Sequence, residues 1–305
     1  MRDGFIRTVL ELAKTDRNIE MVTGDLGFGV LKPFWEAVPD QFINAGIAEQ
    51  NMTSMAAGMA LEGKTVYTYS IGNFPTLRCL EQIRNDCAYH EANVKIVCVG
   101  GGFVYGSLGM SHHATEDLAV MRSLPGIAVF APADQAEAAA VARATAGYPG
   151  TCYIRLGRGG EKKVRESIEH FQVGKALPVQ EGSGVAIFTT GDIYGEAAEA
   201  AVLLEEAGIR PTLYTFPTVK PIDRETILDC ACRHELIVTC EEHNILGGLG
   251  TAVAEVLAES SAAAQLLRLG IEGSYCTAVG DQKYLRRLYG LTGEQIAQRI
   301  LKELA

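Results

Sequence analysis

Hydrophobic and polar positions follow two alternating patterns over the first half of the chain. Helices are predicted where apolar residues recur at helical spacing, at 4–16, 48–63, 76–91, 115–126 and 134–147. Strands are predicted where short continuous apolar runs stand between them, at 19–23, 42–46, 64–70, 94–102, 127–134 and 151–157. Buried strands that alternate with helices are typical of a parallel sheet with helices on both faces.

A second series of the same kind follows a polar stretch that is rich in Gly, Lys, Arg and Glu. Its strands are predicted at 184–191, 210–216, 235–242 and 266–271, and its helices at 195–208, 223–234, 248–260 and 292–304. A length of 305 residues suits about two domains of ~150 residues. We therefore predict an α/β protein with two doubly wound domains: a larger domain over 1–165, a linker over 166–182 and a smaller domain over 183–305.

Composition and charge narrow the class of function. The net charge of −10 argues against nucleic acid as the main partner, because phosphate binding needs a basic surface. The eight cysteines show no paired C-x-x-C spacing, and Cys230, Cys232 and His234 lack a fourth ligand, so we expect free thiols and no metal site. The charged N-terminus has no apolar core of a signal peptide, and no run of 18 apolar residues predicts a membrane span; we expect a cytoplasmic protein.

A ligand site is expected just after the strands of the first domain, since ligands bind at the carboxyl ends of an open parallel sheet. An acid, two adjacent histidines, a glycine-rich loop and an arginine all fall there, in the segments "GDLGFG", "AGIAEQ", "SIGNFP", "GGGFVYGSLGMSHH" and "LGRGG". This clustering of polar, chemistry-bearing residues predicts a site in the first domain.

Each candidate also has an ordinary structural interpretation. Glu49 is either a surface acid in the first turn of a helix or a buried acid that binds a ligand nitrogen, since a buried acid needs a partner. His112 and His113 are either solvated loop residues or proton donors near neutral pH. Arg155 binds either a phosphate or a carboxylate.

Two glycine-rich motifs do not match the nucleotide-binding fingerprints. The motif "VGGGF" at 99–103 is not followed by G-K-[ST], and "GGLGTAV" at 247–253 lacks the distant acid on a second strand. We interpret the second motif as glycines that let a helix start close to a strand.

Seven motifs, in order along nearly the whole chain, resemble the C-terminal half of transketolase and equally that of deoxyxylulose-phosphate synthase. They are "GDLG", "FINAGIAEQNMTSMAAGMAL", "EQIRND", "SHHATEDLAVMRSLPGIAVFAPAD", "YIRLG", "TVKPID" and "EEHNILGGLGTAVAE". The resemblance implies the small subunit of a split transketolase, with a pyrimidine-binding domain and a C-terminal domain.

The resemblance also implies roles for single residues. Members of the family use thiamine diphosphate, and the Glu of their "GIAEQ" motif hydrogen-bonds the aminopyrimidine ring. Glu49 would then be the activating acid in an apolar pocket. The pocket would be lined by Ile47 and Leu26, with Phe74 stacked on the pyrimidine. His112 and His113 match histidines that touch substrate, and Arg155 matches an arginine that binds the sugar phosphate.

A second chain is implied as well, because the G-D-G…N motif that holds the diphosphate and Mg²⁺ in this family is absent here. We expect an N-terminal transketolase subunit to supply it, in an α2β2 assembly with self-association of this chain. The expected reaction moves a two-carbon ketol unit between a ketose phosphate and an aldose phosphate.

Two alternatives remain open. One is a decarboxylating enzyme that uses pyruvate, similar to the synthase or to the beta subunit of a 2-oxoacid dehydrogenase. The other is a non-catalytic binding protein that kept the fold, which the retained Glu49 disfavours. Leu108–Ser111 stands where relatives carry Asp-Gly-Pro-Thr, so the acid that normally contacts a sugar hydroxyl is missing and the sugar is not defined.

Overall fold

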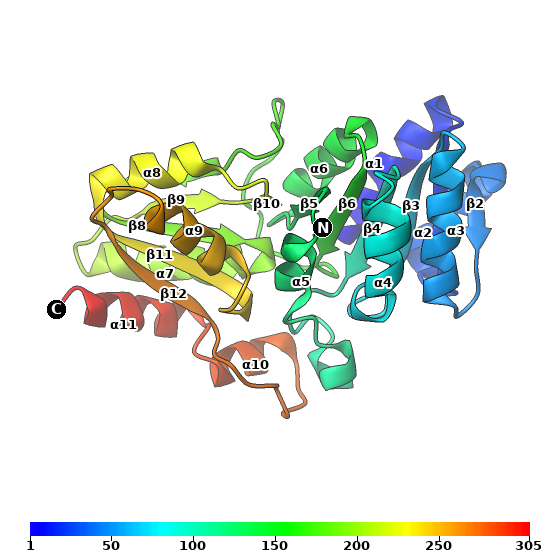
Figure 1. Ribbon diagram of the computed structural model, residues 1–305. Coiled ribbons are helices and arrows are strands. Elements are labelled where there is room, and N and C mark those ends of the chain that lie inside the picture. Colours follow the sequence, from blue (N-terminus) through cyan, green and yellow to red (C-terminus); the bar gives the residue numbers. More distant parts are fainter.

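The computed structural model describes residues 1–305 and shows two α/β lobes side by side (Figure 1). The first lobe has a seven-stranded sheet in the order β10-β5-β6-β4-β3-β1-β2, and the second a five-stranded sheet in the order β12-β11-β8-β9-β7. Only the edge strands β10 and β7 pair antiparallel to their neighbours. The predicted fold class, two doubly wound and mostly parallel α/β units, is confirmed.

Helices cover both faces of the first sheet, as the alternation of helices and strands requires. The strands are β1 (Ile19–Thr23), β2 (Phe42–Asn44), β3 (Thr65–Ile71), β4 (Val94–Val99), β5 (Ile127–Phe130), β6 (Thr151–Leu156) and β10 (Thr218–Lys220). One face packs against α1 (Arg2–Thr15), α2 (Phe28–Ala37) and α6 (Gln135–Gly147). The other packs against α3 (Glu49–Leu61), α4 (Leu80–Gln82), the π-helix η3 (Ile83–Ala88) and α5 (Asp117–Ser123).

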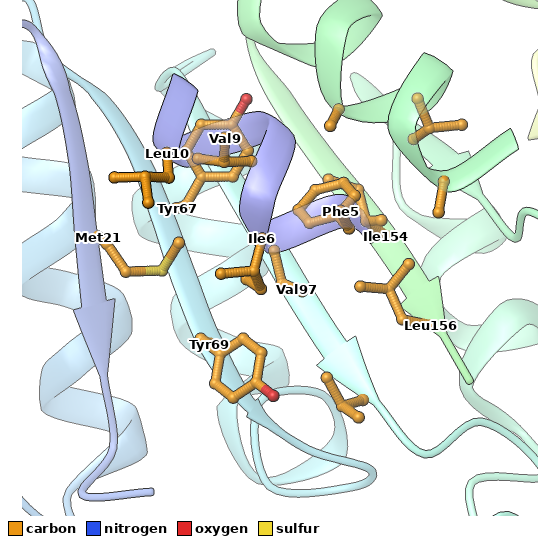
Figure 2. Close-up of a cluster of buried hydrophobic side chains, with 14 of the residues drawn as sticks. Phe5, Ile6, Val9, Leu10, Met21, Tyr67, Tyr69, Val97, Ile154 and Leu156 are labelled. Carbon is orange, nitrogen blue, oxygen red and sulfur yellow. The ribbon is translucent and has the colours of Figure 1, made fainter. Parts of the chain in front are cut away.

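Figure 2 shows how α1 covers the first of these faces. Its apolar residues recur at helical spacing and therefore share one side of the helix. They pack on side chains of β1, β3, β4 and β6, and the labelled residues are Phe5, Ile6, Val9, Leu10, Met21, Tyr67, Tyr69, Val97, Ile154 and Leu156. Burial of each large apolar side chain stabilises the fold by about 1.5–3 kcal/mol, so this face is a main source of stability in the first lobe.

The second lobe repeats the arrangement on a smaller sheet. Its strands are β7 (Leu177–Gln180), β8 (Gly184–Thr190), β9 (Thr212–Thr215), β11 (His234–Asn244) and β12 (Gln265–Ile271). One face packs against α7 (Tyr194–Glu206), α10 (Gln282–Leu288) and α11 (Gly293–Glu303), and the other against α8 (Arg224–Arg233) and α9 (Leu249–Ala258). Short 3-10 turns complete the chain: η1 (Pro39–Gln41), η2 (Leu77–Cys79), η4 (Gly106–Leu108), η5 (Met110–His112) and η6 (Gly191–Ile193).

Several elements differ from the sequence prediction. The helices α2 and α10 and the edge strands β7 and β10 were not predicted, and 76–91 is a series of short 3-10, α and π turns rather than one α-helix. Strand β7 lies inside the stretch 166–182, so this stretch is not only a linker. Strand β10 lies in the range predicted as the smaller domain, 183–305, but it pairs with β5 in the first sheet. Such short edge elements carry too few apolar residues for a periodic signal.

Three further findings concern the cysteines, the possible metal ligands and the length of the helices. All eight cysteines are free, and only Cys232 is exposed. No group of three or more His, Cys, Asp or Glu side chains is placed to hold a metal ion. None of the helices combines the length and apolar character that a membrane span requires.

Candidate active site

The candidate residues follow strands that lie side by side in the first sheet. Glu49 is the first residue of α3, which comes after β2, and Phe74 comes after β3. His112 and His113 lie in the long loop after β4. Strands β2, β1, β3 and β4 are neighbours in the sheet, and all of them run parallel. The sheet therefore brings these segments to one edge, as its topology predicts.

Glu49 is buried, with 4% of its surface exposed. Its Oε2 lies 2.9 Å from Nη1 of Arg78, whose side chain is 48% exposed. A guanidinium group, which the expected apolar pocket did not include, therefore reaches the acid. Arg78 belongs to η2, which follows Phe74, and no sequence pattern singled it out.

Phe74 and His112 lie next to the Glu49–Arg78 ion pair. The guanidinium carbon of Arg78 lies 4.7 Å from the centre of the Phe74 ring, within cation–π range. The Phe74 ring meets the His112 ring edge-on, with 5.1 Å between the ring centres. Glu49, Arg78, Phe74 and His112 thus form one continuous row, which we call the site row.

The two adjacent histidines have different surroundings. His112 is half-buried, and its Nδ1 lies 3.0 Å from Oγ of Ser111. Burial and the neighbouring His113 lower the pKa of His112 below its usual value. His113 is only 3% exposed; its Nε2 lies 3.3 Å from the carbonyl oxygen of Gly106, and its ring meets Phe103 edge-on. Only His112 belongs to the site row.

The two predicted lining residues also differ. Ile47, two positions before Glu49, is 79% exposed, so it presents apolar surface beside the acid. Leu26 is half-buried and packs against the core under α1. Its carbonyl oxygen accepts a hydrogen bond from the Thr23 hydroxyl, which holds the turn after β1.

Arg155 does not lie in the site row. It is 6% exposed, and its Nε lies 3.2 Å from Oδ2 of Asp117. Its Nη2 donates to the carbonyl oxygens of Ala114 and Glu242, at 3.0 and 2.8 Å. Of its two expected partners, phosphate or carboxylate, the structure shows the carboxylate. Its guanidinium is already occupied, so its position does not support the expected role with a sugar phosphate.

Arg158, three residues further on, has the exposure that Arg155 lacks. Its guanidinium carbon lies 5.7 Å from the centre of the Tyr105 ring, and the Tyr105 ring lies 6.5 Å from that of His112. The segment "LGRGG" therefore places an exposed cation beside one end of the site row. The sequence contained this signal, since "LGRGG" follows a predicted strand.

The site row has groups that can bind a nitrogen-containing aromatic ring. It offers a carboxylate that can hydrogen-bond a ring nitrogen and an aromatic face, and Ile47 adds exposed apolar surface two residues before the acid. The aminopyrimidine of thiamine diphosphate has this chemistry.

Comparison with known proteins places the chain in a class and then in a family. Residues 1–161 match the transketolase pyrimidine-binding domain, and residues 174–296 match the transketolase C-terminal domain. A protein from Methanocaldococcus jannaschii, described as a transketolase C-terminal section, is 40% identical over 100% of this chain and 96% of its own length. One of the subunits of an apulose-4-phosphate transketolase from Phocaeicola vulgatus is 35% identical over 99% of this chain and 96% of its own length.

A solved structure gives the same result. A split gene transketolase, described as an inactive beta4 tetramer, is 35% identical and superposes with a TM-score of 0.89 over 99% of this chain and 96% of its own. The chain also resembles 1-deoxy-D-xylulose-5-phosphate synthase from Heliobacterium modesticaldum, with 35% identity over 99% of this chain but only 46% of that protein.

These matches define a thiamine-diphosphate-dependent enzyme of the class that joins a pyrimidine-binding domain to a C-terminal domain. The chain belongs to the transketolase family and corresponds to its C-terminal half. It is a subunit of a transketolase, a transferase that moves a two-carbon ketol unit between a ketose and an aldose.

Proposed function

We propose that this chain supplies the pyrimidine side of an active site that an N-terminal transketolase subunit completes. The main support is Glu49, an acid that is 4% exposed although apolar residues on the same edge, Ile47 and Phe28, are 79% and 59% exposed. Large exposed apolar side chains beside a buried acid are typical of a surface that another chain covers. The partner would hold the diphosphate and Mg²⁺.

The residues of the site row, together with Ile47 and Leu26, have separate roles in this proposal. Glu49 holds and exchanges a proton at a pyrimidine ring nitrogen, Phe74 covers the ring, and Ile47 and Leu26 exclude water around it. Arg78 turns away from Glu49 when the ring is bound. Bound thiamine diphosphate supplies the carbon that stores the electron pair left by carbon–carbon cleavage.

The residues on the substrate side act on the sugar. His112 exchanges a proton with a substrate hydroxyl or carbonyl oxygen, and its lowered pKa keeps a neutral imidazole available near neutral pH. His113 is proposed to reach the substrate as well, although it is 3% exposed and lies deeper in the loop. Arg158, in place of Arg155, binds the sugar phosphate, because it is exposed and lies next to Tyr105 and His112.

The assembly proposed is an α2β2 heterotetramer in the cytoplasm, in which this chain also contacts its own copy. The solved relative described as an inactive beta4 tetramer supports the self-association. In that protein the corresponding chain associates with itself and is inactive. The M. jannaschii relative is named as the C-terminal section of a transketolase. The P. vulgatus relative is named as a subunit of a different transketolase, which acts on apulose 4-phosphate.

Reconstitution tests the proposed function. The chain is mixed with its N-terminal partner, thiamine diphosphate and Mg²⁺, and is then assayed with ketose phosphate donors and aldose phosphate acceptors. We expect ketol transfer from the mixture and none from either chain alone. Pyruvate is tested in parallel, because the synthase is 35% identical over this chain. Release of carbon dioxide from pyruvate, without activity on ketoses, would contradict the proposal.

A further inference from the structure

The segment 100–114, which carries both histidines, is held by the C-terminal domain; we call it the histidine loop. Its Phe103 amide donates to Oε1 of Glu242 at 2.6 Å, although the two residues are far apart in the sequence. At the other end, the Asn244 amide donates to the carbonyl oxygen of Thr115 at 2.8 Å. Both contacts come from the carboxyl end of β11, which therefore holds the loop at both ends.

Glu242 is itself fixed in place by its own domain. It is 2% exposed, and its carboxylate accepts hydrogen bonds from Nε2 of Gln282 at 2.9 and 3.1 Å. Nε of Arg286 forms an ion pair with its Oε2. Gln282 and Arg286 both belong to α10. A buried carboxylate with this many partners has one preferred position, so its contact with Phe103 defines where the loop begins.

The glycines of "VGGGF" now have a physical explanation. At Gly102, where φ is +61°, a Cβ would collide with the Glu242 side chain, whose Cγ would lie at 2.7 Å. At Gly101 a Cβ would collide with Arg155, whose Cγ and Cδ would lie at 2.7 Å. The motif that matched no nucleotide fingerprint therefore allows the backbone to approach these two charged side chains.

Phe103 and Gly102 connect Glu242 to the part of the loop that carries the histidines. Gly102 and Ala114 exchange backbone hydrogen bonds of 2.7 and 3.0 Å, so the start of the loop is bridged to the residue after His113. The Phe103 ring stacks on Tyr289 of the C-terminal domain, with 5.4 Å between ring centres. It also meets His113 edge-on at 5.3 Å.

We infer that Glu242 is a positioning residue for the reaction and sets the place of His112 and His113 through Phe103 and Gly102. This inference rests on the proposed role of the two histidines. The C-terminal domain thus has a part in catalysis, although none of its residues belongs to the site row. A shift of about 1 Å in a catalytic group can lower turnover by roughly 100-fold, so a small movement of the loop is sufficient for a measurable effect.

Two substitutions at one position test the inference in the assembled enzyme. Glu242→Asp keeps the charge beside Arg286 but draws the carboxylate back from the Phe103 amide. Glu242→Gln keeps an acceptor oxygen at full reach but removes the charge beside Arg286. We expect the Asp variant to lose about 10- to 100-fold in kcat and the Gln variant to keep kcat within about fivefold, measured well below its melting temperature. The apparent Kd for thiamine diphosphate should change in neither.

A merely structural role predicts the opposite order. The Gln variant leaves Arg286 with one buried partner fewer, so it should lose more thermal stability than the Asp variant. If activity follows stability, Gln is the worse of the two and the inference is wrong. Equal kcat for wild type and the Asp variant would overturn it as well.

Glu241→Asp is the matched control. Glu241 is the adjacent buried residue of β11, and its carboxylate accepts hydrogen bonds from the Leu249 and Gly250 amides of its own domain, each at 2.8 Å. Hydrogen–deuterium exchange over 100–114 should accelerate in Glu242→Asp and not in Glu241→Asp. This measurement needs no enzyme activity. It therefore tests the inference even if reconstitution of the wild-type enzyme fails and the proposed function is wrong. Glu242→Gln keeps the acceptor for the Phe103 amide, so its exchange over 100–114 should match wild type; acceleration in Glu242→Gln, or unchanged exchange in Glu242→Asp, would contradict the inference.

Discussion

A glutamate in the first turn of a helix is usually solvated, but Glu49 is not. Gly24, after β1, lies against it, and a Cβ on that residue would stand 3.5 Å from the Cγ of Glu49. The sequence placed the acid at the carboxyl edge of the sheet, and the motif "GIAEQ" implied its role. It did not show Arg78, because the ion pair joins residues on α3 and η2 that only the fold brings together.

The substitution Glu49→Gln should lower kcat of the assembled enzyme by at least about 100-fold, because an amide cannot exchange a proton with the pyrimidine nitrogen. Far-UV circular dichroism should show that the fold is retained. Glu62→Gln serves as the control, since Glu62 is an exposed glutamate at the other end of the same helix. Normal turnover in the Glu49 variant would remove this residue from its proposed role.

The arginines show the limit of sequence reasoning for single residues. Arg155 and Arg158 both stand near the end of β6, and spacing alone does not separate them. Burial does: Arg155 is 6% exposed and pairs with Asp117, whereas Arg158 is exposed beside Tyr105.

At the scale of elements, the long periodic helices and the buried strands were predictable, and the short edge elements were not. The helix predicted at 134–147 is α6, and Asp134 caps it by accepting a hydrogen bond from the Glu137 amide at 2.9 Å. In contrast, α2 has Pro33 in its interior, and β10 has three residues that pair with β5 from a distant part of the chain. The local sequence pattern carries little information about such elements, because whether they form depends on the strands and helices they pack against.

Asp134→Ala should lower the free energy of unfolding by about 2 kcal/mol. Asp134 is 2% exposed, and besides capping α6 it accepts the amides of Val164 and Arg165 at 2.8 and 3.2 Å. Asp281, the exposed cap of α10, contacts only the Tyr284 amide, so Asp281→Ala should cost less than about 1 kcal/mol. Urea unfolding measures both, and equal losses would contradict the double role of Asp134.

At the scale of the whole molecule, buried polar groups join the two domains. Glu137 of α6 is fully buried and accepts hydrogen bonds from the Ala133 amide at 2.7 Å and from the hydroxyl of Thr215, in β9, at 2.5 Å. Burial raises the pKa of Glu137 from 4.5 to about 7. A carboxyl group with a raised pKa keeps its proton in the folded state after the unfolded chain has lost it.

This raised pKa gives stability a defined pH dependence. Between about pH 4.5 and 7 the folded state binds more protons at Glu137 than the unfolded state, so its contribution to stability falls as the pH rises. Glu137→Gln removes that dependence. The free energy of unfolding of the variant, relative to wild type, should therefore rise by about 1–3 kcal/mol from pH 5 to pH 8. Urea unfolding at both pH values checks this, and a difference that does not change with pH would contradict it.

The sequence by itself determined the order of most helices and strands, the α/β class and the edge of the sheet where the site lies, because periodicity and strand polarity are local properties of the chain. The motifs at that edge also carried the family resemblance. Only the tertiary structure decided the partner of Glu49, the burial of Arg155 and the hold of Glu242 on the histidine loop. Each of these depends on side chains that are distant in sequence and meet only when the sheets and domains are packed.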